Sequence, residues 1–111
     1  EERGIIAYDV LVNQCNMSAV DFMKLVSENP AKLYGMYPKK GTLAVGSDGD
    51  ITIVDKHIEH VLSKESAHTK ADYIPYEGIS VTGKVRDVIL RGHHVVQDGS
   101  LTESYLGECI P

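Results

Sequence analysis

The chain has 111 residues, which is enough for one domain with a modest core. Its net charge of -5 and the absence of any run of Lys or Arg argue against a nucleic-acid partner. No apolar stretch approaches the roughly 18 residues that cross a membrane, and nothing has the pattern of a signal peptide. We therefore expect a protein with neither nucleic acid nor membrane as a partner.

The two cysteines and the two ends of the chain match no recognisable motif. Cys15 and Cys109 are far apart and follow no metal or disulfide spacing, so we expect two free thiols in a reducing compartment, the cytoplasm. The chain opens with EERGII, without a methionine, and closes with LGECIP. We expect this sequence to be a segment of a longer protein.

Two helices are predicted before residue 36. Ser18 is a favourable N-cap, and apolar residues recur at helical spacing over 19–28. Asn29 followed by Pro30 suits a cap and a first helical turn, which predicts a restart. Gly35 suits the left-handed position that follows a last turn. The stretch NPAKLYG is therefore predicted to be a second, very short helix.

Strands are predicted for the rest of the chain. DITIVD (50–55) alternates and is rich in β-branched residues, and HIEHVL (57–62) is predicted as another strand. KVRDVILRG and HHVVQDG flank a turn at 91–92, which predicts a hairpin. SAHTKADYIPYEG (66–78) has no period and is predicted to be an ordered loop. Two helices followed by strands only is an α+β pattern.

A calcium loop is the first candidate site. Glu59 stands at position 12 counted from Asp48, with Asp50 at position 3. The calcium loop requires glycine at position 6, where this chain has Ile53 inside a predicted strand. We therefore interpret GSDGD (46–50) as a tight turn, in which both glycines are free to take positive φ and both aspartates bond nearby backbone.

The five histidines and their neighbours are the second candidate. His57 and His60 would point to opposite sides of a strand, and the adjacent His93 and His94 also diverge in a hairpin. A zinc site requires more ligands than either pair supplies. His68 lies in the predicted loop, where it can bond backbone. No pairing of Ser or Cys with His indicates nucleophilic catalysis.

Two further patterns have a structural interpretation that we favour. Lys39 and Lys40 could bind an anion, but a solvated basic turn after a helix end is the simpler explanation. Tyr73 and Tyr76 could form a binding surface, but we expect them to pack the loop against its own domain. These residues offer no complete active site.

SENPAKLYGMYPKKGTLAVGSDGDITIVD (27–55) closely resembles the C-terminal region of cyclic amidohydrolases, in the dihydropyrimidinase and hydantoinase branch. Three further stretches fit in order. EER at 1–3 resembles the E-x-R that follows the last barrel strand, HTKADYIPYEG resembles the H-S-K-x-D-Y-x-P-Y-E-G loop, and RGHHVVQDG with GECIP resembles the closing hairpin and tail. Gly49 stands where alanine is usual, Thr69 where serine is usual and Cys109 where phenylalanine is usual, which leaves the substrate subclass open.

The resemblance implies a parent several times this length, with a TIM-like (β/α)8 barrel and a β-sandwich built from both chain ends. Residues 1–36 would be the last helices of the barrel domain, and residues 37–111 the C-terminal part of the sandwich. The segment 27–55 would then be the joint between them. The fold class expected for the chain itself is an α+β fragment.

The resemblance also implies a chemistry for the parent. Two zinc-type divalent metal ions, held by histidines, an aspartate and a carboxylated lysine, would activate a hydroxide that attacks the cyclic amide carbonyl. None of those ligands maps onto 1–111, so no catalytic, cofactor-binding or metal-binding residue is predicted here, and the fragment alone should be inactive. The implied partners are a cyclic amide or ureide substrate and further copies of the parent, as a dimer or tetramer.

Three alternatives remain open. The parent could be a non-enzymatic dihydropyrimidinase-related scaffold protein that lacks the metal ligands. It could be another cyclic amidohydrolase, such as an allantoinase. The chain could also be a free-standing β-rich binding module, which stable, cooperative folding of this segment alone would support. An H-x-H motif at the start of the barrel, outside this chain, would distinguish the enzymes from the scaffold proteins.

Overall fold

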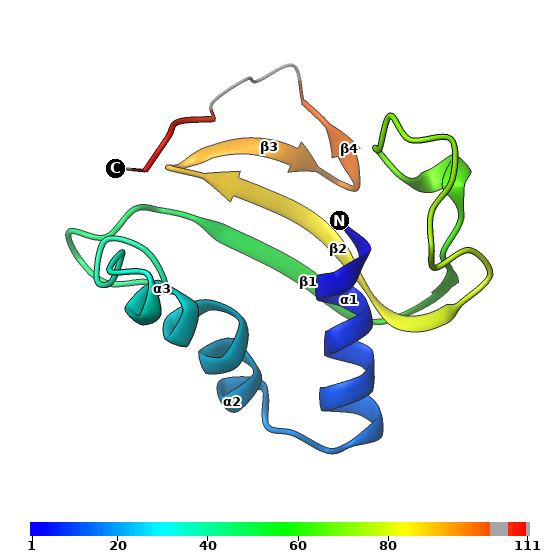
Figure 1. Cartoon of the computed structure of the whole chain (residues 1–111), viewed down its shortest axis with the longest axis horizontal. Coiled ribbons are helices and arrows are strands. Elements are labelled where there is room, and N and C mark those ends of the chain that lie inside the picture. Colours follow the sequence, from blue (N-terminus) through cyan, green and yellow to red (C-terminus); the bar gives the residue numbers. More distant parts are fainter. Residues whose placement is uncertain (103–106, 111) are drawn as a thin grey trace. The chain divides into compact units, whose positions relative to one another are not determined.

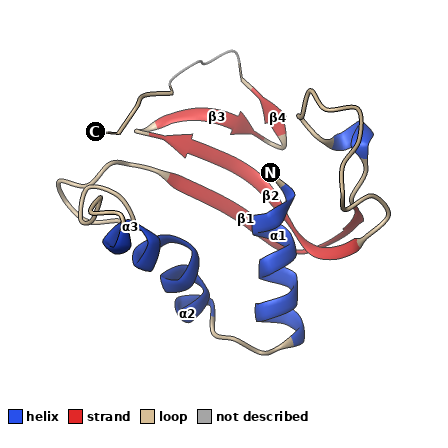
Figure 2. Cartoon of the chain, in the orientation of Figure 1, coloured by secondary structure: helices blue, strands red, loops and turns tan. Residues whose placement is uncertain are grey.

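The computed structural model describes residues 1–102 and 107–110 and has an α+β architecture (Figures 1 and 2). Its helical segments are α1 (Glu2–Tyr8), η1 (Asp9–Gln14), α2 (Ala19–Met23), η2 (Lys24–Glu28), α3 (Asn29–Leu33) and η3 (Lys64–Ser66), and its strands are β1 (Ile51–Val61), β2 (Ser80–Leu90), β3 (His93–Gln97) and β4 (Ser100–Leu101). The described strands form one sheet in the order β1-β2-β3-β4, with β2–β3 and β3–β4 antiparallel. Pro111 of the GECIP tail lies outside the described residues.

The chain divides into two compact units, which are described separately. The first contains Glu1–Val26 and Asp55–Lys84, and the second contains Ser27–Val54 and Val85–Pro111. In the part of the chain that the structure describes, no helix combines the length and apolarity that a membrane crossing requires.

The first unit is built around the contact between α1 and β2. Gly83 has φ +123°, and a Cβ there would lie 3.0 Å from Ile5 Cδ1 and 3.1 Å from Tyr8 Cδ1. Ile5 is buried at this contact, and the Tyr8 ring meets the buried Phe22 ring edge to face at 5.5 Å. A residue without a side chain on the strand therefore lets the helix approach closely.

The helical segment 2–14 was not predicted from the pattern, because no helix was assigned before residue 19. Its N-cap residue, Glu1, makes no side-chain capping bond. The second half, η1, is a π-helix rather than an α-helix. The segment therefore begins without a side-chain cap, and only its first half has the 3.6-residue turn on which helix recognition in a sequence depends.

The helices after residue 18 confirm one prediction and correct another. Ser18 is the N-cap of α2, and its Oγ accepts a hydrogen bond from the Asp21 N–H at 3.1 Å. The very short helix predicted for NPAKLYG is present as α3, but its predicted cap is wrong, because Glu28 is the N-cap residue and η2 runs into α3 without a break. Pro30 lies in the first turn of α3, where its missing N–H does not interrupt the helix.

Gly35 ends α3 as predicted. It has φ +71°, its N–H donates to Lys32 O at 3.2 Å, and the Met36 N–H donates to Ala31 O at 2.8 Å. These two bonds are the Schellman arrangement, in which a left-handed residue satisfies the last carbonyls of a helix.

Gly35→Val should destabilise the full-length protein more than Gly49→Ala. A β-branched residue in the left-handed conformation costs about 1–2 kcal/mol. Gly49 has no positive φ, which corrects one expectation for the 46–50 turn, and its added Cβ would lie 3.4 Å from Gly92 N, an ordinary contact. Gly49→Ala should therefore be neutral or stabilise by about 0.4–1 kcal/mol. Chemical denaturation of both variants is the test, and greater damage from Gly49→Ala would contradict it.

The strand predictions at 50–55, at 57–62 and in the hairpin are confirmed, but the division of the first two stretches is wrong. The stretches 50–55 and 57–62 form a single strand, β1, because no glycine or proline separates them. The β2–β3 hairpin is confirmed, with Arg91 at φ +47° and Gly92 at φ +82°, the signature of a type I′ turn. A second such turn at 98–99, with φ +48° and +75°, joins β3 to β4 and was not predicted, although Asp-Gly is its usual sequence.

Candidate functional site

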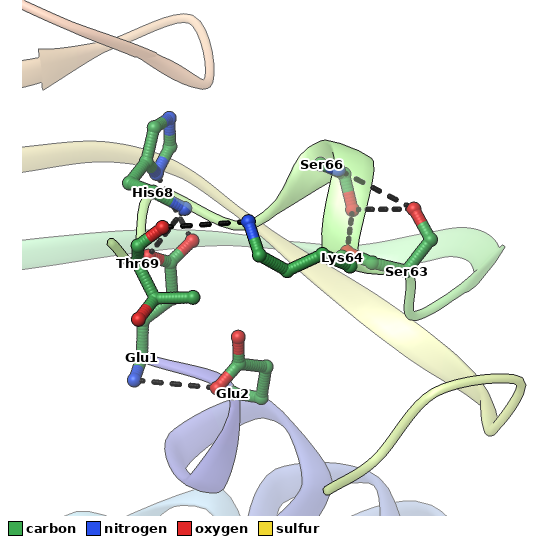
Figure 3. Close-up of polar contacts among 7 residues, drawn as sticks. All are labelled: Glu1, Glu2, Ser63, Lys64, Ser66, His68 and Thr69. Atoms are coloured by element: carbon green, nitrogen blue, oxygen red, sulfur yellow. Dashed lines mark hydrogen bonds and ion pairs between the residues drawn. The ribbon is translucent and has the colours of Figure 1, made fainter. Parts of the chain in front are cut away.

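Glu1 and His68 form a contact between two distant parts of the first unit. His68 Nδ1 lies 3.0 Å from Glu1 Oε1, and the His68 backbone N–H donates to Glu1 Oε2 at 3.2 Å (Figure 3). Because a carboxylate only accepts hydrogen bonds, the ring holds an N–H at Nδ1 toward Glu1. One carboxylate therefore fixes both the backbone and the ring of a loop histidine, 67 residues away in sequence.

The loop that carries His68 is closed on itself. Its ends meet through the Leu62 N–H donating to Ile79 O and the Gly78 N–H donating to Leu62 O, both at 2.9 Å. Glu77 Oε2 accepts from the Lys64 N–H at 2.7 Å. Within the loop, the Ile74 side chain is buried. This is a compact loop with its own packing and not an open excursion.

A cavity of about 390 Å³ lies at the contact between this loop and the start of α1. Its lining mixes acidic, polar and apolar side chains: Glu1, Glu2, His68, Thr69, Ala71, Tyr73, Ile74 and Pro75. We expected Tyr73 to pack the loop against its own domain, and this was wrong. Tyr73 is 69% exposed, and its neighbour Ile74 is buried instead. Tyr76 is half-buried.

The Glu1–His68 pair can position a backbone and hold a proton, but it does not make a hydrolytic site. A hydrolase also needs a nucleophile or a metal-bound water within reach of the base. Within residues 1–102 and 107–110, no group of three or more His, Cys, Asp or Glu side chains could hold a metal ion. The pair is therefore a structural contact.

The acidic turn in the second unit binds a lysine. Lys40 Nζ lies 2.8 Å from Asp48 Oδ2 and also contacts Asp50 Oδ2, so both aspartates of the considered calcium loop are engaged by one ammonium group. The hydrogen bond to Asp48 is the largest cause that raises the pKa of Lys40, and the hydrogen bond to Asp50 is the second. The predicted solvated basic turn is therefore wrong for Lys40, whose side chain is only 15% exposed.

Asp50 joins two segments that are distant in sequence. Its Oδ1 accepts from the Arg91 N–H at 2.8 Å, at the β2–β3 turn. Burial opposes ionisation of Asp50, but Lys40 and the Arg91 N–H outweigh it, so its pKa is lowered. The expectation that this aspartate bonds nearby backbone was wrong, because the Arg91 backbone lies 41 residues away.

The other residues considered in the sequence do not join the cluster of Lys40, Asp48 and Asp50. Glu59 lies on β1 and accepts from Ser80 Oγ at 3.2 Å. His57 is exposed on the same strand. The pKa of His60 is lowered mainly by burial and, to a smaller extent, by the positive charge of Lys84. The adjacent His93 and His94 lie at the start of β3, both exposed. Cys15 and Cys109 are exposed free thiols, and Lys39 is exposed.

The sequence profile of the amidohydrolase family matches residues 2–95. The chain belongs to this family, as the resemblance indicated. Among curated relatives, it is 44% identical over 108 residues to the D-hydantoinase of Ralstonia pickettii, covering 97% of this chain and 22% of that protein. It is 43% identical over 98 residues to the D-hydantoinase of Geobacillus stearothermophilus, covering 88% and 21%.

Solved structures agree with this assignment. The fold matches a D-hydantoinase from Bacillus sp. AR9 with a TM-score of 0.88 at 45% identity, covering 92% of this chain and 22% of that one. It matches a dihydropyrimidinase from Brevibacillus agri NCHU1002 with a TM-score of 0.87 at 40% identity, covering 91% and 22%. The chain thus spans about a fifth of the length of the relatives it matches.

Proposed function

We propose that this chain is the C-terminal part of a metal-dependent cyclic-amide hydrolase of the dihydropyrimidinase and hydantoinase type. The observation that carries the proposal is the 44% identity to a D-hydantoinase over 97% of this chain. The parent would hydrolyse the cyclic amide bond of dihydropyrimidines or hydantoins. It would be a cytoplasmic homo-oligomer, either a dimer or a tetramer.

Within that parent, residues 1–36 would be the last helices of the (β/α)8 barrel and residues 37–111 the C-terminal part of the β-sandwich. The distribution of elements supports this division. The helices α1, α2 and α3 all precede residue 36, and the four described strands all follow residue 37. The turn that separates them carries the Lys40, Asp48 and Asp50 cluster, which would fix the joint.

The metal ions of the proposed enzyme do not fit the residues present here. No donor cluster suited to a metal occurs in the described part of the chain. The ligands of two zinc-type divalent ions would therefore come from outside residues 1–111. Bound there, the ions would supply a polarised carbonyl and an activated water. The residues of this chain would contribute architecture around that site.

The hydrolase is favoured over the scaffold alternative by the relatives themselves. The similar proteins and structures carry the names of hydantoinases and a dihydropyrimidinase. The scaffold alternative predicts no H-x-H motif at the start of the upstream barrel, whereas the hydrolase predicts one. The upstream sequence therefore separates these two functions directly.

The test is a comparison of the fragment with its full-length parent. The parent, loaded with zinc, should hydrolyse hydantoin or dihydrouracil. The isolated 111-residue chain should show no turnover above a metal blank, even with added zinc, because it has no ligand set. Turnover by the fragment would contradict the assignment of the chemistry to the missing part. An inactive parent would contradict the hydrolase itself.

The isolated fragment should also bind a hydrophobic dye or self-associate. Large apolar side chains are exposed on its helices and on the turns that follow them: Val20, Met23, Leu33, Tyr34, Leu43 and Val45. In the proposed parent the rest of the protein covers such surface, which a free fragment leaves open to solvent. Dye fluorescence and sedimentation measure this. A monomer with a sharp two-state melt and no dye binding would contradict it.

A further inference from the structure

The contact between the loop 63–78 and the residue that opens α1 has a consequence for the proposed reaction. In a (β/α)8 barrel the active site is built by the connections that lead from each strand to the following helix. If α1 follows the last barrel strand, as the resemblance of EER implies, then Glu1 stands at the end of one of these connections. His68, which binds Glu1 through its ring and its backbone, brings the loop to the same place.

The loop is suited to hold that connection still. It is closed at its base by the Leu62–Ile79 and Gly78–Leu62 hydrogen bonds, and its own Ile74 is buried. Further bonds tie its first residues together: Ser63 Oγ accepts from the Ser66 N–H at 3.3 Å, and Lys64 Nζ reaches Thr69 O at 3.5 Å (Figure 3). A rigid support that grips one carboxylate at two points restricts both its position and its orientation.

We propose that His68 is a positioning residue of the hydrolase: by holding Glu1 it fixes the last strand-to-helix connection of the barrel at the catalytic face. This inference rests on the proposed function. The effect of His68 passes through Glu1 to the residues that precede α1, so its loss disturbs the geometry of the reacting centre and leaves most of the binding contacts in place.

The experiment uses the full-length, zinc-loaded enzyme. His68→Leu removes the ring contact, His68→Gln keeps a side-chain donor, Glu1→Ala removes the acceptor, and His57→Leu is the matched control at an exposed histidine of β1. Metal content, thermal midpoint, kcat and KM are measured for hydantoin and dihydrouracil. Amide hydrogen exchange is followed in peptides covering 1–8 and 67–76.

His68→Leu and Glu1→Ala should each lower kcat about tenfold, with KM changed less than kcat. The double variant should be no worse than the poorer single variant, because both changes remove the same contact. His68→Gln should recover most of the activity. Metal content and thermal midpoint should match those of His57→Leu, and exchange should rise in both peptides of His68→Leu.

Three results would overturn the inference: kcat of His68→Leu equal to that of the control, additive losses in the double variant, or a loss of activity that follows loss of metal. An active wild-type enzyme with any of these results leaves the proposed function intact. A wild-type enzyme that hydrolyses no cyclic amide overturns the proposed function, and the positioning role of His68 with it.

Discussion

Gly41→Ala should destabilise the full-length protein by about 2–5 kcal/mol. Gly41 has φ +83°, and an added Cβ would lie 2.5 Å from Ala31 Cβ and 3.0 Å from Ser27 O. Ala31 is itself buried on α3. The new methyl group therefore adds overpacking against a helix to the cost of a left-handed backbone.

The matched control is Gly35→Ala. Gly35 has a similar φ of +71°, but its added Cβ meets nothing within 4 Å. It should therefore show the conformational cost alone, about 1–2 kcal/mol. Denaturant unfolding of the two variants, each in the full-length protein, separates the packing contribution as the difference between them. Equal losses would mean that the loop moves away from α3 without cost.

A compensating change tests the contact itself. Ala31→Gly removes the atom that the new methyl group meets most closely, at the cost of a glycine in a helix, about 0.5–1 kcal/mol. In the Gly41→Ala background it should recover part of the lost stability. In the wild-type background it should only destabilise. A double variant that is less stable than Gly41→Ala alone would contradict the clash as the cause.

Local signals predicted the parts of this fold that local chemistry determines. Ser18 caps a helix because its hydroxyl can reach the Asp21 N–H three residues on. Gly35 and the Arg91–Gly92 turn follow from which residues tolerate positive φ. In each case the cause and its effect lie within four residues of one another, so a single sequence contains the necessary information.

The contacts that assemble each unit could not be predicted in the same way. Asp50 meets the Arg91 backbone 41 residues away, and Glu1 meets His68 at a separation of 67. Gly41 lies against Ala31 of α3, and nothing in PKKG indicates that a helix packs there. A carboxylate or a glycine has no partner preference strong enough to identify one residue among 111. Sequence patterns therefore did not predict the contact between Glu1 and His68. Only the family resemblance of EER and HTKADYIPYEG singled out the two stretches that contain these residues.

Asp9→Ala should lower the free energy of unfolding of the full-length protein by about 2–4 kcal/mol, because three hydrogen-bond donors lose the carboxylate that they share. Asp9 is 7% exposed, at the junction of α1 and η1. Its Oδ1 accepts from Asn13 Nδ2 at 2.8 Å and from the Thr82 N–H at 3.1 Å, and its Oδ2 accepts from Gln14 Nε2 at 2.9 Å. The Thr82 bond ties the helix to β2, 73 residues away.

Asp72→Ala is the control for the loss of a carboxylate as such. Asp72 is exposed in the loop 66–78. Its replacement should change the free energy of unfolding by less than about 0.5 kcal/mol. Denaturant unfolding at neutral pH compares the two variants with the wild-type protein. Similar small losses would mean that solvent or neighbouring groups satisfy the donors around Asp9 once its carboxylate is gone.

The Asp9 contribution should also depend on pH in a defined direction. The hydrogen bond from Asn13 is the largest influence on its pKa, and together with those from Gln14 and Thr82 it outweighs burial, so the pKa is lowered from 3.8. A carboxyl whose pKa is lower in the folded state stabilises it above the unfolded value, and this stabilisation is lost as the pH falls through the folded value. The stability gap between wild type and Asp9→Ala should therefore be constant from neutral pH to about pH 5 and narrow below 3.8. Groups common to both proteins cancel in this difference, so a gap that widens on acidification would show that the carboxylate is not stabilised by its three donors.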